Sequence, residues 1–145
     1  MLPIETYKTF YSNIEERYQT LITNLLSFNT ETLDKRITEV AAYHAFLGAV
    51  LAYAKSRYDA RNMEHNEVVS KVKAEAIHGA ASKLSDAKLD SLSILNPKVK
   101  ESYAGLLEEE YRYFLCKNLY ASVETLKDML IQASSNRRSE IKLTT

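Results

Sequence analysis

PIETYKTFYSNIEERYQTLITNLLS, residues 3–27, is the stretch that decides the fold class. Its apolar residues recur at alternating spacings of three and four, which is the period of a helix that buries one side. The pattern continues for about three heptads without a miss, as in a helix that packs lengthwise against a partner. The seam consists of Ile4, Tyr7, Tyr11, Ile14, Tyr18, Leu21 and Leu25. We predict a heptad helix over 1–29, packed either in its own chain or against a second copy.

A second long helix is predicted over 30–83, because helical periodicity resumes after the cap-forming residues near Thr32. Its apolar residues lie on two sides, so we expect neighbours on both. One side carries Leu33, Ile37, Val40, His44, Leu47, Leu51, Ala54 and Tyr58, and the other carries Tyr43, Phe46, Val50 and Tyr53. The polar stretch 62–66 leaves open whether this helix is continuous or kinked.

Gly79, several serines and an Asn-Pro pair then predict a break in regular structure. Asn96 is a suitable N-cap and Pro97 a suitable first helical residue, so a third helix is predicted over 96–136. The acidic cluster at 108–110 is expected on its exposed side. The sequence therefore predicts an all-α protein, an elongated bundle of three long helices in a single domain over 1–145, with a basic tail at 137–145.

The composition narrows the classes of function. Basic and acidic residues number 19 each, so the net charge is zero, which disfavours indiscriminate binding of polyanions but permits a local basic stripe. No apolar run approaches the ~20 residues of a membrane span, so we expect no contact with a membrane. The N-terminus has no basic region followed by an apolar stretch, which argues against secretion. One cysteine suits a reducing, cytoplasmic location. Ten tyrosines, several of them on secondary stripes, favour a homo-oligomer.

No arrangement of residues indicates catalysis, a cofactor or a metal site. The three histidines, His44, His65 and His78, do not have the spacing of a zinc-binding helix. Cys116 lies among apolar residues, which predicts a buried and unreactive thiol. We therefore expect a protein that is not an enzyme, with no cofactor and no bound metal.

Basic residues concentrate in two regions. Lys55, Arg57, Arg61, Lys71 and Lys73 follow the second helix, where Tyr53 and Tyr58 stand between them. Cations beside aromatic rings suit single-stranded nucleic acid, since cations track phosphates and rings stack on bases. The alternative is an ordinary solvated helix face.

The second basic region is the tail, where Arg137, Arg138 and Lys142 follow the predicted end of the third helix. Cations at that position either complement the helix dipole or contact a polyanion. The sequence leaves both interpretations open.

The order of these features resembles the small helical recombination mediators of bacteriophages, of the UvsY-like type. The similar segments are AAYHAFLGAVLAYAKSRYDA (41–60), KVKAEA (71–76) and YRYFLCKNLYASVETLKDMLIQASSNRRSE (111–140). The resemblance implies an oligomeric protein that binds single-stranded DNA and helps to load a recombinase onto DNA covered by single-strand-binding protein. It implies that Lys71 and Lys73 contact DNA, with Arg57, Arg61 and the 137–138 pair in support.

The sequence also permits a second function. The seam of the first helix and the tyrosine-rich flanks of the others require only protein partners. A helical structural or adaptor protein that contacts no nucleic acid is therefore the alternative hypothesis, and helix bundles serve both kinds of role.

Overall fold

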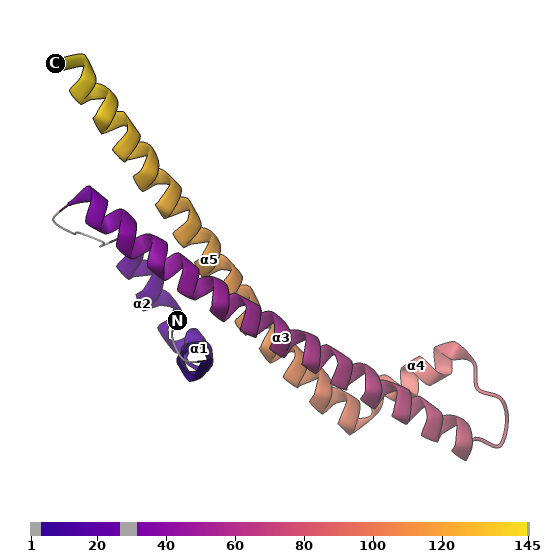
Figure 1. Cartoon of the computed structure of the whole chain (residues 1–145). Coiled ribbons are helices and arrows are strands. Elements are labelled where there is room, and N and C mark those ends of the chain that lie inside the picture. The colour runs from indigo at the N-terminus through magenta and orange to yellow at the C-terminus, as the bar shows by residue number, and fades with distance from the viewer. Residues whose placement is uncertain (1–3, 27–31, 145) are drawn as a thin grey trace. The chain divides into compact units, whose positions relative to one another are not determined.

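A computed structural model describes the protein over residues 4–26 and 32–144 (Figure 1). Five helices occupy these residues: α1 (Ile4–Ser12), α2 (Ile14–Leu26), α3 (Leu33–Gly79), α4 (Asp86–Leu95) and α5 (Pro97–Thr144). No strand occurs within the two described ranges. The prediction of an all-α fold is confirmed, whereas the structure has five helices where the sequence predicted three.

The chain divides into two compact units. Unit 1 comprises residues 1–54 and 112–145, and unit 2 comprises Lys55–Tyr111. Unit 1 therefore takes α1, α2 and parts of α3 and α5, and unit 2 takes the remaining parts of α3 and α5 together with α4. A single domain over 1–145 was expected from the length alone, and length carries no information about this internal division.

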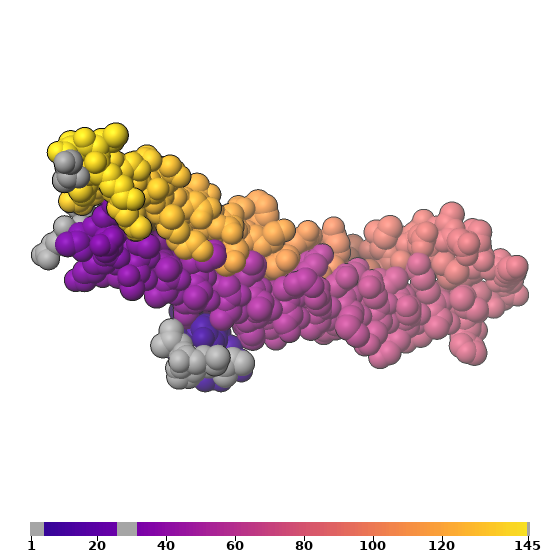
Figure 2. Space-filling model, turned by 45° about the horizontal axis from the view of Figure 1, so that its top comes forward, coloured from indigo at the N-terminus to yellow at the C-terminus, as the bar shows by residue number. Residues whose placement is uncertain are grey.

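Unit 1 contains the larger core. Its largest fully buried side chains come from α2, α3 and α5, namely Ile14, Val40, Leu47, Val50, Leu119 and Val123. Within unit 1, α1 and α2 pack beside the N-terminal part of α3, and the C-terminal part of α5 lies against the same part of α3 (Figures 1 and 2). The first-helix seam is used inside the chain, with Tyr11, Ile14 and Leu25 buried and Tyr7, Tyr18 and Leu21 packed against the same core. The side chain of Ile4 is outside the described part of the chain.

Aromatic rings fix α1 against α3. The rings of Phe10 and Phe46 meet edge to face with centroids 5.2 Å apart, and those of Tyr11 and Tyr53 do so at 5.3 Å. Edge-to-face pairs add to the gain from burial because the positive ring edge faces the negative ring surface. These contacts hold a helix of nine residues, which is too short to be stable by itself.

The first predicted helix is interrupted at Asn13, so the expectation of one helix over 1–29 is corrected. The Asn13 N–H is shared between the carbonyls of Thr9 and Phe10, at 3.3 and 3.2 Å. The preceding Ser12 hydroxyl donates back to the Lys8 carbonyl at 2.9 Å, a bond that often bends helices. Heptad spacing continues across this residue because one irregular turn does not shift the seam.

The second predicted helix ends earlier than expected, at Gly79 and not at 83, and it is continuous through 62–66. The serine-containing segment after it forms an additional helix, α4, which the sequence did not predict. Ser85 caps α4 by accepting a hydrogen bond from the Lys88 N–H at 3.2 Å. The serines that indicated a break thus include the one that begins a new helix.

The third predicted helix begins where expected and ends later. The side chain of Asn96 accepts a hydrogen bond from the Lys98 N–H at 2.9 Å, and Pro97 is the first helical residue. The helix then continues to Thr144, so Arg137 and Arg138 lie inside α5 and not in a tail beyond it. Ser134, Ser135 and Asn136 do not end it, because serine and asparagine lower helix propensity only modestly.

One helix corrects the expectation about apolar length. An 18-residue window of α3 has a mean hydropathy of 1.3, so by length and composition this helix is able to cross a membrane. The apolar residues of α3 do not form one run in the sequence, because polar residues such as Glu39 and His44 stand between them. Core helices of globular proteins pass the same test, and Phe46, Leu47 and Val50 of α3 contribute to the core of unit 1. This single helix is weak evidence for a membrane span.

Leu119 is fully buried, and we expect Leu119→Ala to lower the free energy of unfolding by about 2–5 kcal/mol, because it removes apolar contacts and leaves a cavity. Leu143→Ala is the matched control, since Leu143 is 87% exposed and should change stability by less than about 0.5 kcal/mol. Urea unfolding followed by circular dichroism measures both. Equal stability of the two variants would contradict the placement of Leu119.

Candidate nucleic-acid interface

The seven basic residues predicted to bind nucleic acid are divided between the two units. Lys55, Arg57, Arg61, Lys71 and Lys73 lie on the α3 part of unit 2, and Arg137 and Arg138 lie on the α5 part of unit 1. Most members of the first group already have acidic partners.

Arg57 and Arg61 converge on one buried carboxylate. Arg57 Nη2 donates to Glu109 Oε1 at 3.1 Å, and Arg61 Nε lies 3.9 Å from the same oxygen. Glu109 is only 3% exposed, so it needs a positive partner to offset the loss of hydration. Arg61 also contacts Glu64 at 3.1 Å. These two arginines hold α3 to α5 in unit 2, and their charge is largely compensated.

The burial of Glu109 corrects the expectation that the whole acidic cluster at 108–110 is exposed. Glu109 lies three residues after the buried Leu106 and therefore on the same side of α5. Its spacing from Leu106 was visible in the sequence. Its pairing with Arg57 was not visible in the sequence, because 52 residues separate the two.

Two lysines form ion pairs near the surface. Lys55 Nζ lies 2.9 Å from Asp59 Oδ2 one turn further along α3, and Lys73 Nζ lies 2.7 Å from Asp90 Oδ1 on α4. Pairs of this kind contribute about 0–1 kcal/mol, because water and salt screen the attraction. The charge of each lysine is thus balanced by a neighbouring carboxylate, but the ion pair is weak.

Lys71 differs from the other four. It is exposed, and it takes part in no ion pair within the described residues. Glu67 and Glu75 are four residues before and after it along α3, where they lower the local positive potential. Lys71 and Lys73 are two residues apart, or about 200° around the helix, so they do not form one stripe. The predicted basic run is therefore scattered over several faces of α3.

The aromatic residues expected between these cations are also engaged. Tyr53 belongs to unit 1 and packs edge to face on Tyr11. Tyr58 is partly buried. Within unit 2 an alternative ring is Tyr103 of α5, which lies beside His65 with centroids 5.6 Å apart. The alternation of cations and rings seen in the sequence is therefore not reproduced on one surface.

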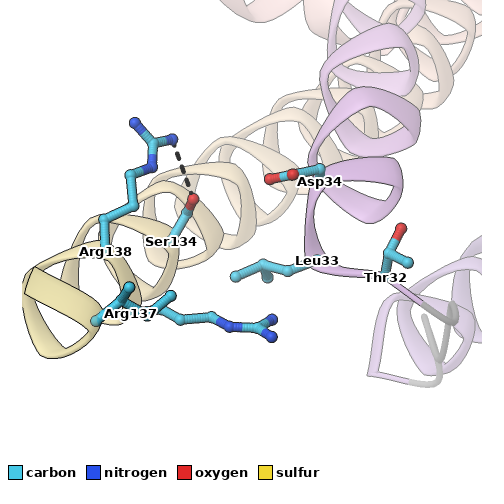
Figure 3. Close-up of a pocket in the computed structure, with 7 residues that line it drawn as sticks. Thr32, Leu33, Asp34, Ser134, Arg137 and Arg138 are labelled. Carbon is cyan, nitrogen blue, oxygen red and sulfur yellow. Dashed lines mark hydrogen bonds between the residues drawn. The ribbon is translucent and has the colours of Figure 1, made fainter. Parts of the chain in front are cut away.

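Arg137 and Arg138 line a hollow of about 360 Å³ where α5 passes the start of α3 (Figure 3). Arg138 donates to the hydroxyl of the buried Ser134 at 3.2 Å, while Arg137 extends toward Leu33. The first residues of a helix favour anions, but Asp34 already places a carboxylate in this hollow. Both arginines are exposed, so the arrangement permits a phosphate contact without requiring one.

Two of the three histidines make specific contacts within the described residues. His65 Nδ1 lies 2.7 Å from Ser102 Oγ, and His44 stacks on Tyr120 with centroids 4.4 Å apart. Among the residues that the structure describes, no group of three or more His, Cys, Asp or Glu side chains is placed to hold a metal ion. The predicted burial of Cys116 is confirmed, since its side chain lies in the core of unit 1.

Sequence reasoning missed a surface of apolar side chains. Tyr103, Leu107 and Tyr111 have the helical spacing of packing positions in the third helix, yet all three are exposed. The packed side of α5 in unit 2 instead contains Val99, Leu106 and Glu109. A single sequence could not separate the two sides, because each has apolar residues at helical spacing.

Comparison of the chain with protein families, with curated proteins and with solved structures finds no match.

We expect Glu109→Gln to lower the free energy of unfolding by about 1–3 kcal/mol, because the buried side chain at position 109 then offers the two guanidinium groups only an uncharged and weaker partner. The control is Glu110→Gln, since Glu110 is exposed and its replacement should stay within about 0.5 kcal/mol of the parent. Thermal and urea unfolding provide the comparison. A stability of Glu109→Gln equal to that of the control would show that the ion pair is not important.

Burial raises the pKa of the Cys116 thiol from 9.0 to about 12. The unfolded chain therefore loses this proton first as the pH rises, so the thiol's contribution to stability is complete below pH 9 and declines toward pH 12. At pH 8 only about one thiol in ten thousand is ionised in the folded protein, and reaction with a disulfide reagent should await unfolding.

Two measurements check this behaviour of Cys116. One is the rate of thiol labelling with and without denaturant. The other is the difference in thermal midpoint between the parent and Cys116→Ala as the pH rises from 8 to 11, which should decrease. Rapid labelling of the folded protein at pH 8 would contradict the burial of this side chain.

Proposed function

We propose that this chain is a non-enzymatic accessory protein that assembles as a homo-oligomer and binds single-stranded DNA, in the manner of the recombination mediators it resembles. The observation that carries the proposal is Lys71, an exposed cation without an acidic partner within the described residues, in KVKAEA (71–76), one of the three segments that carry the resemblance. Loading of a recombinase onto DNA covered by single-strand-binding protein is the role that the resemblance suggests.

The ion pairs restrict which residues contact DNA. Arg57 and Arg61 pair with the buried carboxylate of Glu109, so drawing them toward a phosphate would take positive partners away from a buried charge at a large cost. Lys55 and Lys73 pair with exposed carboxylates, and a phosphate oxygen is able to replace such a partner with little loss. We therefore assign contact with DNA to Lys71 first and to Lys55 and Lys73 second.

Assembly of several copies increases the number of cations that are available to one DNA strand. A single chain offers few available cations, and its net charge is zero. Several copies that hold one strand together multiply weak contacts, because the second contact is made at high effective concentration. DNA binding by this protein should accordingly depend on its oligomeric state. Arg137 and Arg138 in unit 1 would add to the contacts where their hollow admits a phosphate.

A helical adaptor protein without nucleic acid is the second candidate. It is favoured by the engagement of Arg57 and Arg61 with Glu109 and by the exposed apolar side chains on α5. In this case the cations are structural and the apolar surface is functional. Binding of single-stranded DNA at low salt separates the two candidates.

We expect the assembled protein to bind labelled oligo-dT at about 50 mM salt, with an affinity that falls steeply as salt rises. Lys71→Ala should weaken binding several-fold and reduce the slope of log K against log salt by about 0.7 for each phosphate that the protein no longer neutralises. Fluorescence anisotropy across a salt series measures both quantities.

The control for this experiment is Lys8→Ala, because Lys8 lies on α1 and is paired with Glu5 at 3.3 Å. It should bind as the parent does. An intact oligomer that does not bind oligo-dT at low salt would reject DNA binding and leave the adaptor function.

A further inference from the structure

Unit 2 exposes an apolar surface on one side of α5. Tyr103, Leu107 and Tyr111 are 50%, 45% and 54% exposed, and successive members are four residues apart on the helix. Residues at this spacing are neighbours on one side of a helix. Val99, Leu106 and Glu109 are buried on a different side of α5, where it meets the rest of unit 2. We call the exposed residues 100–111 on this side the α5 face.

The area of the α5 face fits the centre of an interface. A large side chain that is half exposed presents about 100 Å² of apolar surface, so the three together present about 300 Å². Patches of this size on single chains are commonly functional. A stable interface buries about 800 Å² on each partner, mostly by adding a polar rim around such a centre. The face is therefore large enough to anchor an interface, but it needs its flanking polar residues.

We propose that the α5 face pairs with the α5 face of a second copy of this chain, with the two helices antiparallel. Lys100, Ala104, Leu107 and Tyr111 are spaced four, three and four apart, which is the seam of a paired helix. When Ala104 of one copy lies opposite Leu107 of the other, Lys100 lies opposite Tyr111. Each contact then occurs twice, as in any two-fold interface.

The position of Lys100 favours this orientation. Lys100 and Glu110 are exposed at the two ends of the α5 face, and neither takes part in an ion pair within the residues described. In the antiparallel pair the Lys100 ammonium meets the Tyr111 ring, and Glu110 comes beside the Tyr103 hydroxyl. In a parallel pair in register, the seam would place Lys100 opposite Lys100. Repulsion between like charges therefore opposes the parallel arrangement.

A second copy suits the face better than DNA or a charged protein does. Glu101, Glu108 and Glu110 lie on or beside the face and repel phosphates. The chain has zero net charge, so two copies approach without net repulsion. This inference rests on the proposed function only for the statement that the protein assembles. It adds that the α5 face is the surface used and that the assembly has an even number of chains.

The test uses the full chain and sedimentation velocity at tens of micromolar. The parent should have a mass that is an even multiple of the chain mass, and Leu107→Glu should reduce that mass by at least two-fold. Circular dichroism should show unchanged helix content, since position 107 is exposed and glutamate favours helices. The control is Met63→Glu, which introduces the same charge at a 65% exposed residue of unit 2 on α3. It should retain the parent mass.

Cysteine cross-linking tests the orientation. Copies with Ala104→Cys mixed with copies with Leu107→Cys should form mixed disulfide dimers on oxidation, and each variant alone should cross-link poorly. Native Cys116 does not interfere, because it is buried in unit 1. Cross-linking of each variant with itself and not in the mixture would replace the antiparallel pair by a parallel one and overturn the proposal.

The other possible results of the sedimentation experiment either support or reject the α5 face as an interface. A monomeric parent, or a Leu107→Glu variant with the parent mass, would reject the α5 face as an interface. Binding of oligo-dT is measured separately on the same samples. An oligomer that is disrupted by Leu107→Glu but binds no oligo-dT would support the interface and reject the proposed function. An oligomer that binds oligo-dT and is unaffected by Leu107→Glu would support the proposed function and reject the interface.

Discussion

A long helix buries only the strip of surface that a neighbour covers, and this constraint governs both units of the chain. In unit 1, α3 has neighbours on two sides, so Leu47 and Val50 are buried between α1, α2 and α5. In unit 2 fewer helices are present, and the core is correspondingly smaller. Its buried residues include Glu109, which is a carboxylate and not an apolar side chain. Leu107 and Tyr111 of α5 stay about half exposed, as does Tyr103, although its ring also lies beside His65 of α3.

The overall zero charge is realised as local pairs. Arg57 and Arg61 meet Glu109, Lys73 meets Asp90, and in unit 1 Arg112 meets Glu15 at 3.1 Å. Some of these pairs join different helices and therefore help to specify which helix lies beside which. A polyanion that binds this chain has to replace carboxylates more often than it fills an empty basic surface. That requirement favours sites where the acidic partner is exposed, and it makes the cations near Glu109 unsuitable.

The helical period of the apolar residues was sufficient to predict the fold class. The start of α5 was predictable because its cap, formed by Asn96 and Pro97, depends only on residues that are adjacent in the sequence. The helical period was insufficient for the break at Asn13 and for α4, because a shared hydrogen bond and a single serine cap leave no periodic signal. The site was less predictable than the fold. Arg57 and Arg61 look like free cations in the sequence, since their partner is distant along the chain and belongs to a different helix. Lys71 and Lys73 look adjacent, but a helix places residues two apart on different sides.

Asn13 has a consequence for how the protein opens. The amide that would continue one long helix is divided there between two carbonyls, and α1 has only nine residues. Cooperativity between turns is therefore weakened at this point, and α1 depends on the rings of Phe10 and Tyr11 for its stability. Local unfolding follows the weakest such junction, so the backbone amides of α1 should exchange their hydrogens with solvent long before those around Leu47. The N-terminal helix is thereby a separable element, able to leave the core while the rest of unit 1 remains folded.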